Sequence, residues 1–525
     1  MMFEEFKLDK RDKYFLVFLI LFSTLLVIHY IYFNLKVGVT CSDVYVYLVN
    51  ALYYTGINRC AAENIFLSPT VCFLTSILFR LGLVDTVAIY IVTGVLAIIG
   101  NIGLYFLLRR YFNKIYSLTG VIVYSTLSLN LVWLANGTLD IPAVSFTIWL
   151  ILFGIIAIDE NPKFYLYASL IFVLGFFTRY SVVLTLPPLI LYYIYQKGFK
   201  IHEEDKKYIK KAFIIGAVIG IIILAVVVAM GHGQFEAGHQ MVNRATGESG
   251  YYSDPAFNPS ITYYLEKLPN FISNSNTLFS ANPIIKNPTL LSWAVIAIFV
   301  VGAGIWVMNN TTNLKRIEKL PMILLILSVL IVRDVSPLIT IFMVMLAFYY
   351  IGQDSKHKIG ILMMMWLLSN LIFYSNYNIK VTRYIIPAMP AVIFFLLKAV
   401  DNIQINFKIN KNVIPIVLII LFAIQGFAFT MTYEQTDRFN SHQEVIDYIH
   451  ELNPDNPDVK IGVYNQRAYL WLYGDNAMGL VSRNQSAIDQ ADISYYIASS
   501  RLYELQNFTE IRVFNDLYLY ERTNV

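Results

Sequence analysis

Charged residues are scarce in this chain of 525 residues, and several of them stand directly beside apolar stretches. The carboxylates, guanidiniums and tyrosines in such positions are Asp43, Asp140, Arg179, Tyr180, Arg383 and Tyr384. A carboxylate can take a proton from a hydroxyl group, and a guanidinium can bind two oxygens of a phosphate at once. These residue types could therefore move a group from a phosphate to a hydroxyl, if the fold brings them together.

Each of these residues also has a purely structural explanation. Asp43 and Asp140 immediately precede helical stretches, so each could be a helix N-cap. The arginines could be anchors that extend to the membrane interface. The sequence leaves both explanations open for Asp140 and favours a functional role for Asp43, which lies among apolar and tyrosine residues.

A second candidate site consists of His232, Glu236 and His239. Their i, i+4, i+7 spacing would place them on one face of a helix, where they could bind a divalent metal as a cofactor. Three glycines between and beside them argue against a stable helix. The sequence therefore favours the alternative, in which these residues bind no metal.

The composition decides the class of protein that must position these residues. Hydrophobic residues make up 57% of the chain and charged residues only 14%, with a mean hydropathy of +0.58. Soluble domains carry about a quarter charged residues, so a single soluble globule is excluded. The net charge of +4 is small and does not suggest nucleic-acid binding. Apolar runs of nearly 20 residues predict an α-helical polytopic membrane protein surrounded by membrane lipids.

About thirteen membrane spans are predicted. The first follows a basic N-terminus, exceeds the core of a signal peptide and lacks a cleavage site of small residues, so we expect it to be retained. The spans lie at 14–35, 85–108, 115–133, 141–158, 164–178, 181–196, 212–230, 290–308, 320–333, 335–351, 359–375, 384–400 and 412–431.

The distribution of basic residues predicts the orientation. With the N-terminus in the cytoplasm, the loops on the inner side hold more than half of the 39 lysines and arginines, as the positive-inside rule requires. An odd number of spans then places the C-terminus outside. The six candidate residues all adjoin the outer ends of spans. Together with Lys380 and with Arg333 and Asp334, they come from five outer turns that could face one cavity.

Three outer segments are too long to be simple turns. Segment 36–84 contains two amphipathic stretches, 43–55 and 69–82, which predict helices along the membrane surface. Segment 231–289 is a long polar loop. Residues 432–525 predict a small external α/β domain beside the membrane domain, 1–431, with a helix at 443–452 and several short strands. Within it, 471–475 is expected to be a strand and a turn. Cys41 and Cys60 bracket the first surface helix and could be either a disulfide or two free thiols.

Four stretches resemble, in the right order, motifs of the GT-C superfamily of membrane glycosyltransferases. The similarity is to glycosyltransferase family 39, with its aminoarabinose-transferase and protein-mannosyltransferase relatives. The stretches are Ser42-Asp43 with Tyr47, the Pro-containing segment 67–82, Asp140-Ile141-Pro142 together with 178–188, and Arg-Tyr-Ile-Ile-Pro-Ala-Met-Pro at 383–390. The chain departs from the family at Val44, where a second carboxylate is common, and at Ser68, where many relatives have lysine.

The resemblance implies an enzyme that transfers a sugar, hexosyl or pentosyl, from a polyprenyl-phosphate-linked donor to a hydroxyl of a lipid, glycan or protein at the outer face of the cell membrane. Asp43 would be the catalytic base and Asp140 a second acidic residue of the site. Arg383 and Tyr384, with Arg179 and Tyr180, would bind the phosphate and lipid of the donor. Three alternatives remain: transfer of a larger glycan or a non-sugar group, a lipid or solute transporter with an outward binding site, and a scaffold subunit.

Overall fold

The computed structural model describes most of the chain. It covers residues 10–56, 69–229, 257–274, 277–278, 284–285, 288–309, 319–331, 336–352, 358–432, 440–456, 458–464, 466–480, 484–503, 505–515 and 517–523. The predicted metal site at His232, Glu236 and His239 lies outside these residues, as does Cys60.

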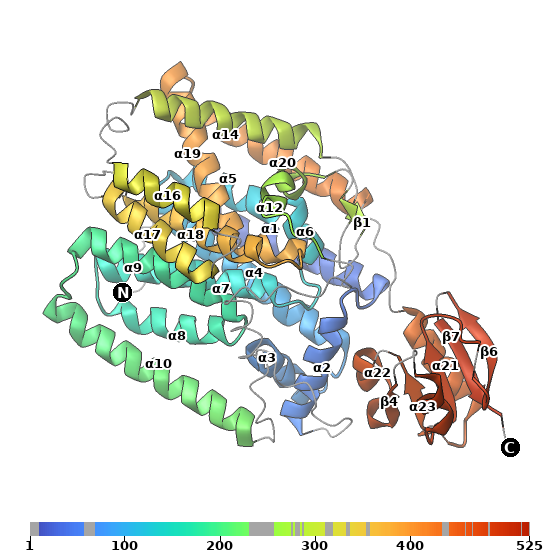
Figure 1. Cartoon of the computed structure of the whole chain (residues 1–525). Helices are drawn as coiled ribbons and strands as arrows, with labels where there is room; N and C mark the ends of the chain where they lie inside the picture. The colour runs from blue at the N-terminus through green and yellow to red at the C-terminus, as the bar shows by residue number, and fades with distance from the viewer. Residues whose placement is uncertain are drawn as a thin grey trace.

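The membrane part is a bundle of helices (Figure 1). Its helices are α1 Lys10–Val37, α4 Thr86–Arg109, α5 Lys114–Ser125, α6 Ser128–Trp133, α7 Asp140–Asp159, α8 Phe164–Phe176, η1 Tyr180–Thr185, α9 Leu186–Lys197, α10 Glu203–Ala229, α14 Leu290–Asn309, α16 Lys319–Ile331, α17 Pro337–Gly352, α18 Lys358–Asn376, η2 Thr382–Ala388, α19 Met389–Phe407 and α20 Val413–Thr432. Between α10 and α14 lie α12 Tyr263–Glu266, α13 Leu268–Ile272 and the short strands β1 Thr277–Leu278 and β2 Ile284–Ile285.

Each predicted span coincides with a helical segment, and a membrane-embedded helical fold is confirmed. Among the described residues, eight helices are long and apolar enough to cross a membrane. Three predicted spans are interrupted: 115–133 is divided into α5 and α6, and 181–196 and 384–400 begin with the 3-10 helices η1 and η2. Helix α7 lies at the centre of the bundle, and 94% of its most apolar stretch is buried inside the protein. Helix α10 lies at the edge, and only 6% of its most apolar stretch is buried (Figure 1).

The two expected surface helices are present as α2, Ser42–Thr55, and α3, Pro69–Arg80. They pack against each other, and Arg80 at the end of α3 donates to the carbonyl oxygen of Tyr54, 2.7 Å away. Helix α2 is more enclosed than its amphipathic pattern predicts, because its residues 44–52 are all buried by protein. It is therefore a rigid element from which a side chain can be positioned.

The C-terminal residues form the expected small α/β domain. Its helices are α21 Asn440–Leu452, α22 Gln466–Leu472, η3 Gly474–Asn476 and α23 Gln485–Gln490, and its strands are β3 Ile461–Val463, β4 Ala477–Gly479, β5 Tyr495–Ala498, β6 Phe508–Phe514 and β7 Leu517–Arg522. The strand order is β4-β3-β5-β7-β6, parallel on both sides of β3 and antiparallel for the remaining pairs.

One prediction in this domain is wrong. Residues 471–475, expected to be a strand and a turn, are the end of α22 followed by the start of η3. Trp471 continues the helix that begins at Gln466, and its ring stacks on Phe79 of α3, so this segment packs against the membrane part as a helix.

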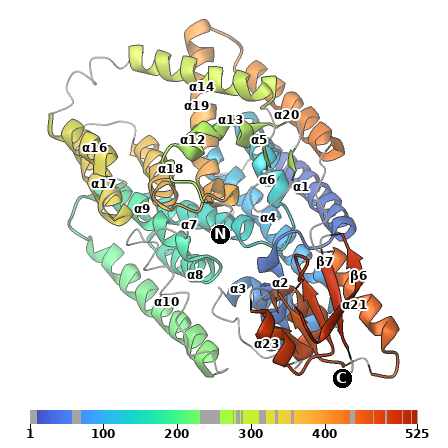
Figure 2. The same ribbon diagram turned by 45° about the vertical axis from the view of Figure 1, so that its right-hand side comes forward.

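The C-terminal domain is seated on α2 and α3, as Figures 1 and 2 show. The ring of Trp471 stacks on Phe79 of α3, with centroids 5.9 Å apart and an angle of 23°. Leu470 packs against Val49 of α2. These contacts bring α22 next to the helix that carries Asp43.

Candidate active site

A tightly held loop precedes Asp140. The side-chain nitrogen of Asn34 in α1 donates to the carbonyl oxygens of Leu134 and Ala135, at 3.2 and 3.0 Å. Gly137 has φ +84° and lies against α2, where an added Cβ would come within 2.8 Å of Val44. A left-handed backbone without a side chain is thus required here. The loop fixes the start of α7 relative to α2.

Both candidate carboxylates belong to helix N-termini, but neither is a helix cap. Asp43 is the second residue of α2, whose N-cap is Cys41, and Asp140 is the first residue of α7, whose N-cap is Leu139. Neither N-cap makes a side-chain hydrogen bond. The capping explanation is therefore wrong for both residues, and their carboxylates are directed to other partners.

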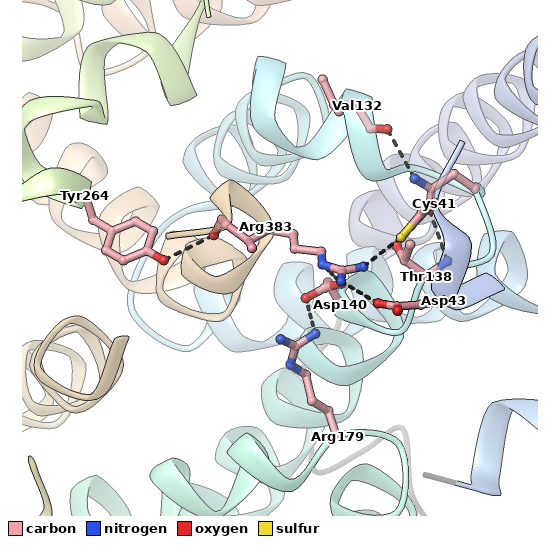
Figure 3. Close-up of polar contacts among 10 residues, drawn as sticks. Cys41, Asp43, Val132, Thr138, Asp140, Arg179, Tyr264 and Arg383 are labelled. Atoms are coloured by element: carbon pink, nitrogen blue, oxygen red, sulfur yellow. Dashed lines mark hydrogen bonds and ion pairs between the residues drawn. The ribbon is translucent and has the colours of Figure 1, made fainter. Parts of the chain in front are cut away.

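Arg383 connects the two carboxylates (Figure 3). Its Nη2 donates to Oδ2 of Asp43 at 2.6 Å, and its Nε lies 3.6 Å from Oδ2 of Asp140. Its Nη1 lies 3.4 Å from the sulfur of Cys41, which is a free thiol. The guanidinium lies 5.2 Å from the ring centroid of Trp133, a favourable cation–π geometry. Arg383 is thus fixed from four directions.

Arg179 holds Asp140 from the opposite side (Figure 3). Its Nη1 donates to Oδ1 of Asp140, whose side chain is only 1% exposed. The guanidinium lies 4.9 Å from the ring centroid of Tyr384, and that ring stacks on Tyr374 at 5.1 Å. The adjacent residues Arg383 and Tyr384 therefore both help to position the charges. Tyr180 packs its ring edge-on against Phe176.

The C-terminal domain supplies a charge that the sequence analysis missed. Nη1 of Arg467, in α22, lies 3.5 Å from Oδ1 of Asp43, and 49% of the Arg467 side chain is exposed. The sequence offers no signal for this contact, because Arg467 adjoins no apolar span and precedes a segment that was expected to be a strand. Five separate elements thus contribute to one cluster.

The cluster keeps Asp43 ionised. Burial by itself would raise the pKa of the Asp43 carboxyl, but Arg383, followed by Arg467 and Arg179, outweighs that effect and lowers the pKa below its usual value. Two carboxylates face three guanidiniums, so the cluster carries one surplus positive charge. An ionised carboxylate that is 28% exposed can accept a proton from an incoming group.

A divalent metal does not fit between these carboxylates. The guanidinium of Arg383 lies between Asp43 and Asp140 and supplies the positive charge that a metal would otherwise provide. Within the part of the chain that the structure describes, no group of three or more His, Cys, Asp or Glu residues could hold a metal ion. The positive charges between these carboxylates are therefore guanidinium groups.

Lys380, which precedes the span of Arg383, does not point to the cluster. Its ammonium donates to the carbonyl oxygens of Tyr374, Ser375 and Tyr377, at 3.2, 2.6 and 2.5 Å, and so caps the end of α18. Burial lowers the pKa of Lys380 to about 8. It is a structural residue beside the site. Arg333 and Asp334, in another predicted outer turn, lie outside the described residues.

The cluster lies at the end of the bundle opposite to the basic turns. Helix α7 carries Asp140 at its first residue, and Glu160, directly after its last residue, bonds Arg110 at 2.8 Å. Twenty residues of α-helix separate the two ends by about 30 Å, which is the thickness of the apolar part of a bilayer.

Comparisons with known proteins find proteins of similar fold. The family model of dolichyl-phosphate-mannose-protein mannosyltransferases matches residues 67–230. The crystal structure of ArnT from Cupriavidus metallidurans bound to undecaprenyl phosphate is similar in fold, with a TM-score of 0.59 and 10% identity, over 95% of this chain and 97% of that one. The apo structure of the same protein gives 0.57 and 10%, over 96% and 97%. No curated protein matches by sequence.

The family model and the fold are both similar to those of GT-C membrane glycosyltransferases, which is the resemblance that the sequence motifs predict. The family model covers less than a third of the chain, and the similarity to ArnT, at 10% identity, shows the fold alone.

Proposed function

We propose that the protein transfers a sugar, hexosyl or pentosyl, from a polyprenyl-phosphate-linked donor to an acceptor hydroxyl at the extracytoplasmic face of the cell membrane. The acceptor is a lipid, a glycan or a protein. The proposal rests on one observation: Asp43, Asp140, Arg179 and Arg383 come from four distant parts of the chain and form one charged cluster.

The basic turns indicate which side of the membrane the charged cluster faces. The cluster and the Arg110–Glu160 pair lie at opposite ends of α7. The positive-inside rule assigns the end with the basic turns to the cytoplasm, so the cluster faces outward. Nucleotide sugars are confined to the cytoplasm, and an outward site therefore needs a donor that the membrane itself carries. Supporting this, the similar ArnT structure contains undecaprenyl phosphate.

In the proposed reaction, Asp43 takes the proton of the acceptor hydroxyl. The hydroxyl oxygen forms a bond to the anomeric carbon, and the bond from that carbon to the phosphate oxygen breaks, so that the electron pair leaves with the lipid phosphate. Arg179 and Arg383 stabilise the negative charge that grows on this phosphate. A single displacement of this kind inverts the anomeric carbon.

Asp140 has a positioning role in this scheme. Its side chain is almost fully buried and bonds Arg179, with Arg383 close by, so it holds the two guanidiniums at the position of the leaving phosphate. Asp43 is the more exposed of the two carboxylates, and for that reason we assign proton transfer to Asp43.

A transporter with an outward binding site is the competing function, and turnover distinguishes the two. The full chain in nanodiscs is supplied with lipid extracts that contain polyprenyl-phosphate-linked sugars, and the release of free polyprenyl phosphate is measured by mass spectrometry. An enzyme produces it, and Asp43→Asn stops production while the protein still binds undecaprenyl phosphate. If the intact lipid-linked sugar is bound and never cleaved with any extract, the transporter is favoured.

A further inference from the structure

Helix α22 directs one guanidinium to the candidate base. Arg467, Leu470 and Trp471 have the spacing i, i+3, i+4 and therefore share one face of this helix. Leu470 packs on Val49 of α2, and Trp471 stacks on Phe79 of α3. With these two contacts in place, the remaining residue of the face lies over the beginning of α2, where Asp43 is located.

Arg467 differs from the other two arginines of the cluster. The side chains of Arg179 and Arg383 are 18% and 11% exposed, and each donates a hydrogen bond to a carboxylate. Arg467 is half exposed, and its contact with Asp43 is an ion pair at 3.5 Å without a hydrogen bond. Two carboxylates already balance the two buried arginines, so Arg467 carries the surplus charge and is the arginine that can exchange its partner.

The two oxygens of Asp43 face different parts of the molecule. Oδ2 is hydrogen-bonded to Arg383, which belongs to the membrane part. Oδ1 makes no hydrogen bond within the described residues and has Arg467 of the C-terminal domain as its neighbour. The proton of an acceptor must therefore arrive at Oδ1, from the side of the C-terminal domain. In an in-line displacement the leaving phosphate departs on the opposite side, toward Arg179 and away from Arg467.

We infer that Arg467 is a binding residue for the acceptor, and that this acceptor carries an anionic group, a phosphate or a carboxylate, near its reacting hydroxyl. This inference rests on the proposed function and adds to it the acceptor's chemical class and the domain that recognises it. When the anionic group takes the guanidinium of Arg467, Oδ1 of Asp43 is released to accept the proton. The C-terminal domain thus forms one wall of the acceptor site.

Binding measurements on the full chain in nanodiscs test this inference. The probes are glucose, which is neutral, and glucose 6-phosphate and glucuronate, which carry the two candidate anions; binding is followed by tryptophan fluorescence, because Trp471 lies one turn from Arg467. We expect the wild type to bind at least one of the anionic sugars about tenfold more tightly than glucose, and that sugar identifies the anion. Arg467→Ala should lose this preference, and Arg467→Lys should keep part of it because a point charge replaces the planar fork.

Arg501→Ala is the matched control. Arg501 belongs to the same domain, is 53% exposed and bonds Glu510 at 2.6 Å, far along the chain from Asp43. This variant should bind all three sugars as the wild type does. Because both arginines are exposed, neither substitution should affect folding, which a thermal melt of each variant verifies.

Titration of undecaprenyl phosphate into the same samples distinguishes a failure of the acceptor assignment from a failure of the proposed function. Arg467→Ala should bind it as tightly as the wild type does. The acceptor assignment is overturned if the wild type binds neither anionic sugar more tightly than glucose. It is also overturned if Arg467→Ala keeps the preference of the wild type for an anionic sugar. Loss of undecaprenyl phosphate binding in Arg467→Ala also overturns it, because the arginine would then belong to the donor. A wild type that binds no undecaprenyl phosphate contradicts the proposed function instead.

Discussion

Replacing Asp43 with asparagine separates a chemical role from a structural one. The amide has the same shape as the carboxylate, and its oxygen can still accept the hydrogen bond from Nη2 of Arg383. Arg383 also keeps Asp140 as a neighbour at 3.6 Å. The substitution should therefore leave the fold intact. It removes the ability to accept a proton at neutral pH.

The expected loss is large. Removing a positioned general base costs about two to four orders of magnitude in rate, which corresponds to about 3–5 kcal/mol in the activation barrier. The formal charge of the cluster rises from one surplus positive charge to two. Because Arg383 loses one of its two anionic partners, it should bind the anionic lipid phosphate at least as tightly as before. We therefore expect a low kcat together with an unchanged or lower apparent Kd for undecaprenyl phosphate.

The assay is release of polyprenyl phosphate under single-turnover conditions, with undecaprenyl phosphate binding measured on the same preparation. Asp85→Asn is the control, because Asp85 caps α4 by accepting from the backbone N–H of Val87 at 2.8 Å. Asparagine caps a helix as well as aspartate does, so this variant should turn over normally. If Asp43→Asn also turns over as fast as the wild type, Asp43 is not the base and the proposed mechanism is wrong.

Four further outcomes are expected. Arg467→Ala should move the acid limb of the kcat/KM profile to higher pH: the arginine helps to lower the pKa of Asp43, so without it the base becomes protonated at a higher pH; an unshifted limb would contradict this coupling. Gly137→Ala should lower the free energy of unfolding by about 1–2 kcal/mol because of the left-handed backbone, and by more because the new Cβ would lie 2.8 Å from Val44. The change should be measured as a lower Tm and a reduced turnover. Arg383→Ala should raise the apparent KM for the donor more than that for the acceptor, and Arg383→Lys should restore part of it, since one ammonium cannot replace the fork; equal donor affinity in all three proteins would remove Arg383 from the donor site. Treatment with EDTA should leave turnover unchanged, because a guanidinium lies between the carboxylates; a loss that added Mg²⁺ or Mn²⁺ restores would show a metal requirement.

Hydropathy alone predicts the membrane-embedded helical fold, because each apolar span must match the thickness of the bilayer. The same constraint predicts the depth in the membrane of residues that adjoin the ends of spans. Asp140, Arg179 and Arg383 all adjoin a span end that was predicted to be outer, and residues at the ends of spans that match the bilayer must lie at nearly the same height. Their convergence in the structure is in that sense a consequence of local sequence.

The depth of a residue in the membrane does not determine the direction in which its side chain points around the helix axis. For that reason the sequence could not identify which charged side chains contact one another. Lys380 stands only three residues before Arg383, yet it turns back to the carbonyl oxygens at the end of α18, whereas Arg383 reaches both carboxylates. Likewise, a residue that begins a helix can cap it or point away, and both aspartates point away. Helix rotation and packing decide such choices, and both depend on the whole bundle.

The most distant contact of the cluster has no local cause at all. Arg467 lies more than 400 positions after Asp43 and belongs to a domain whose own pattern gives no hint of the membrane part. What brings them together is the docking of α22 on α2 and α3 through Leu470 and Trp471. The sequence by itself therefore determined the helical membrane fold and which residues beside the spans could carry the chemistry. Tertiary packing alone decided which of these charges meet and added Arg467 to them, because apolar surfaces without local sequence signals control how the domains fit.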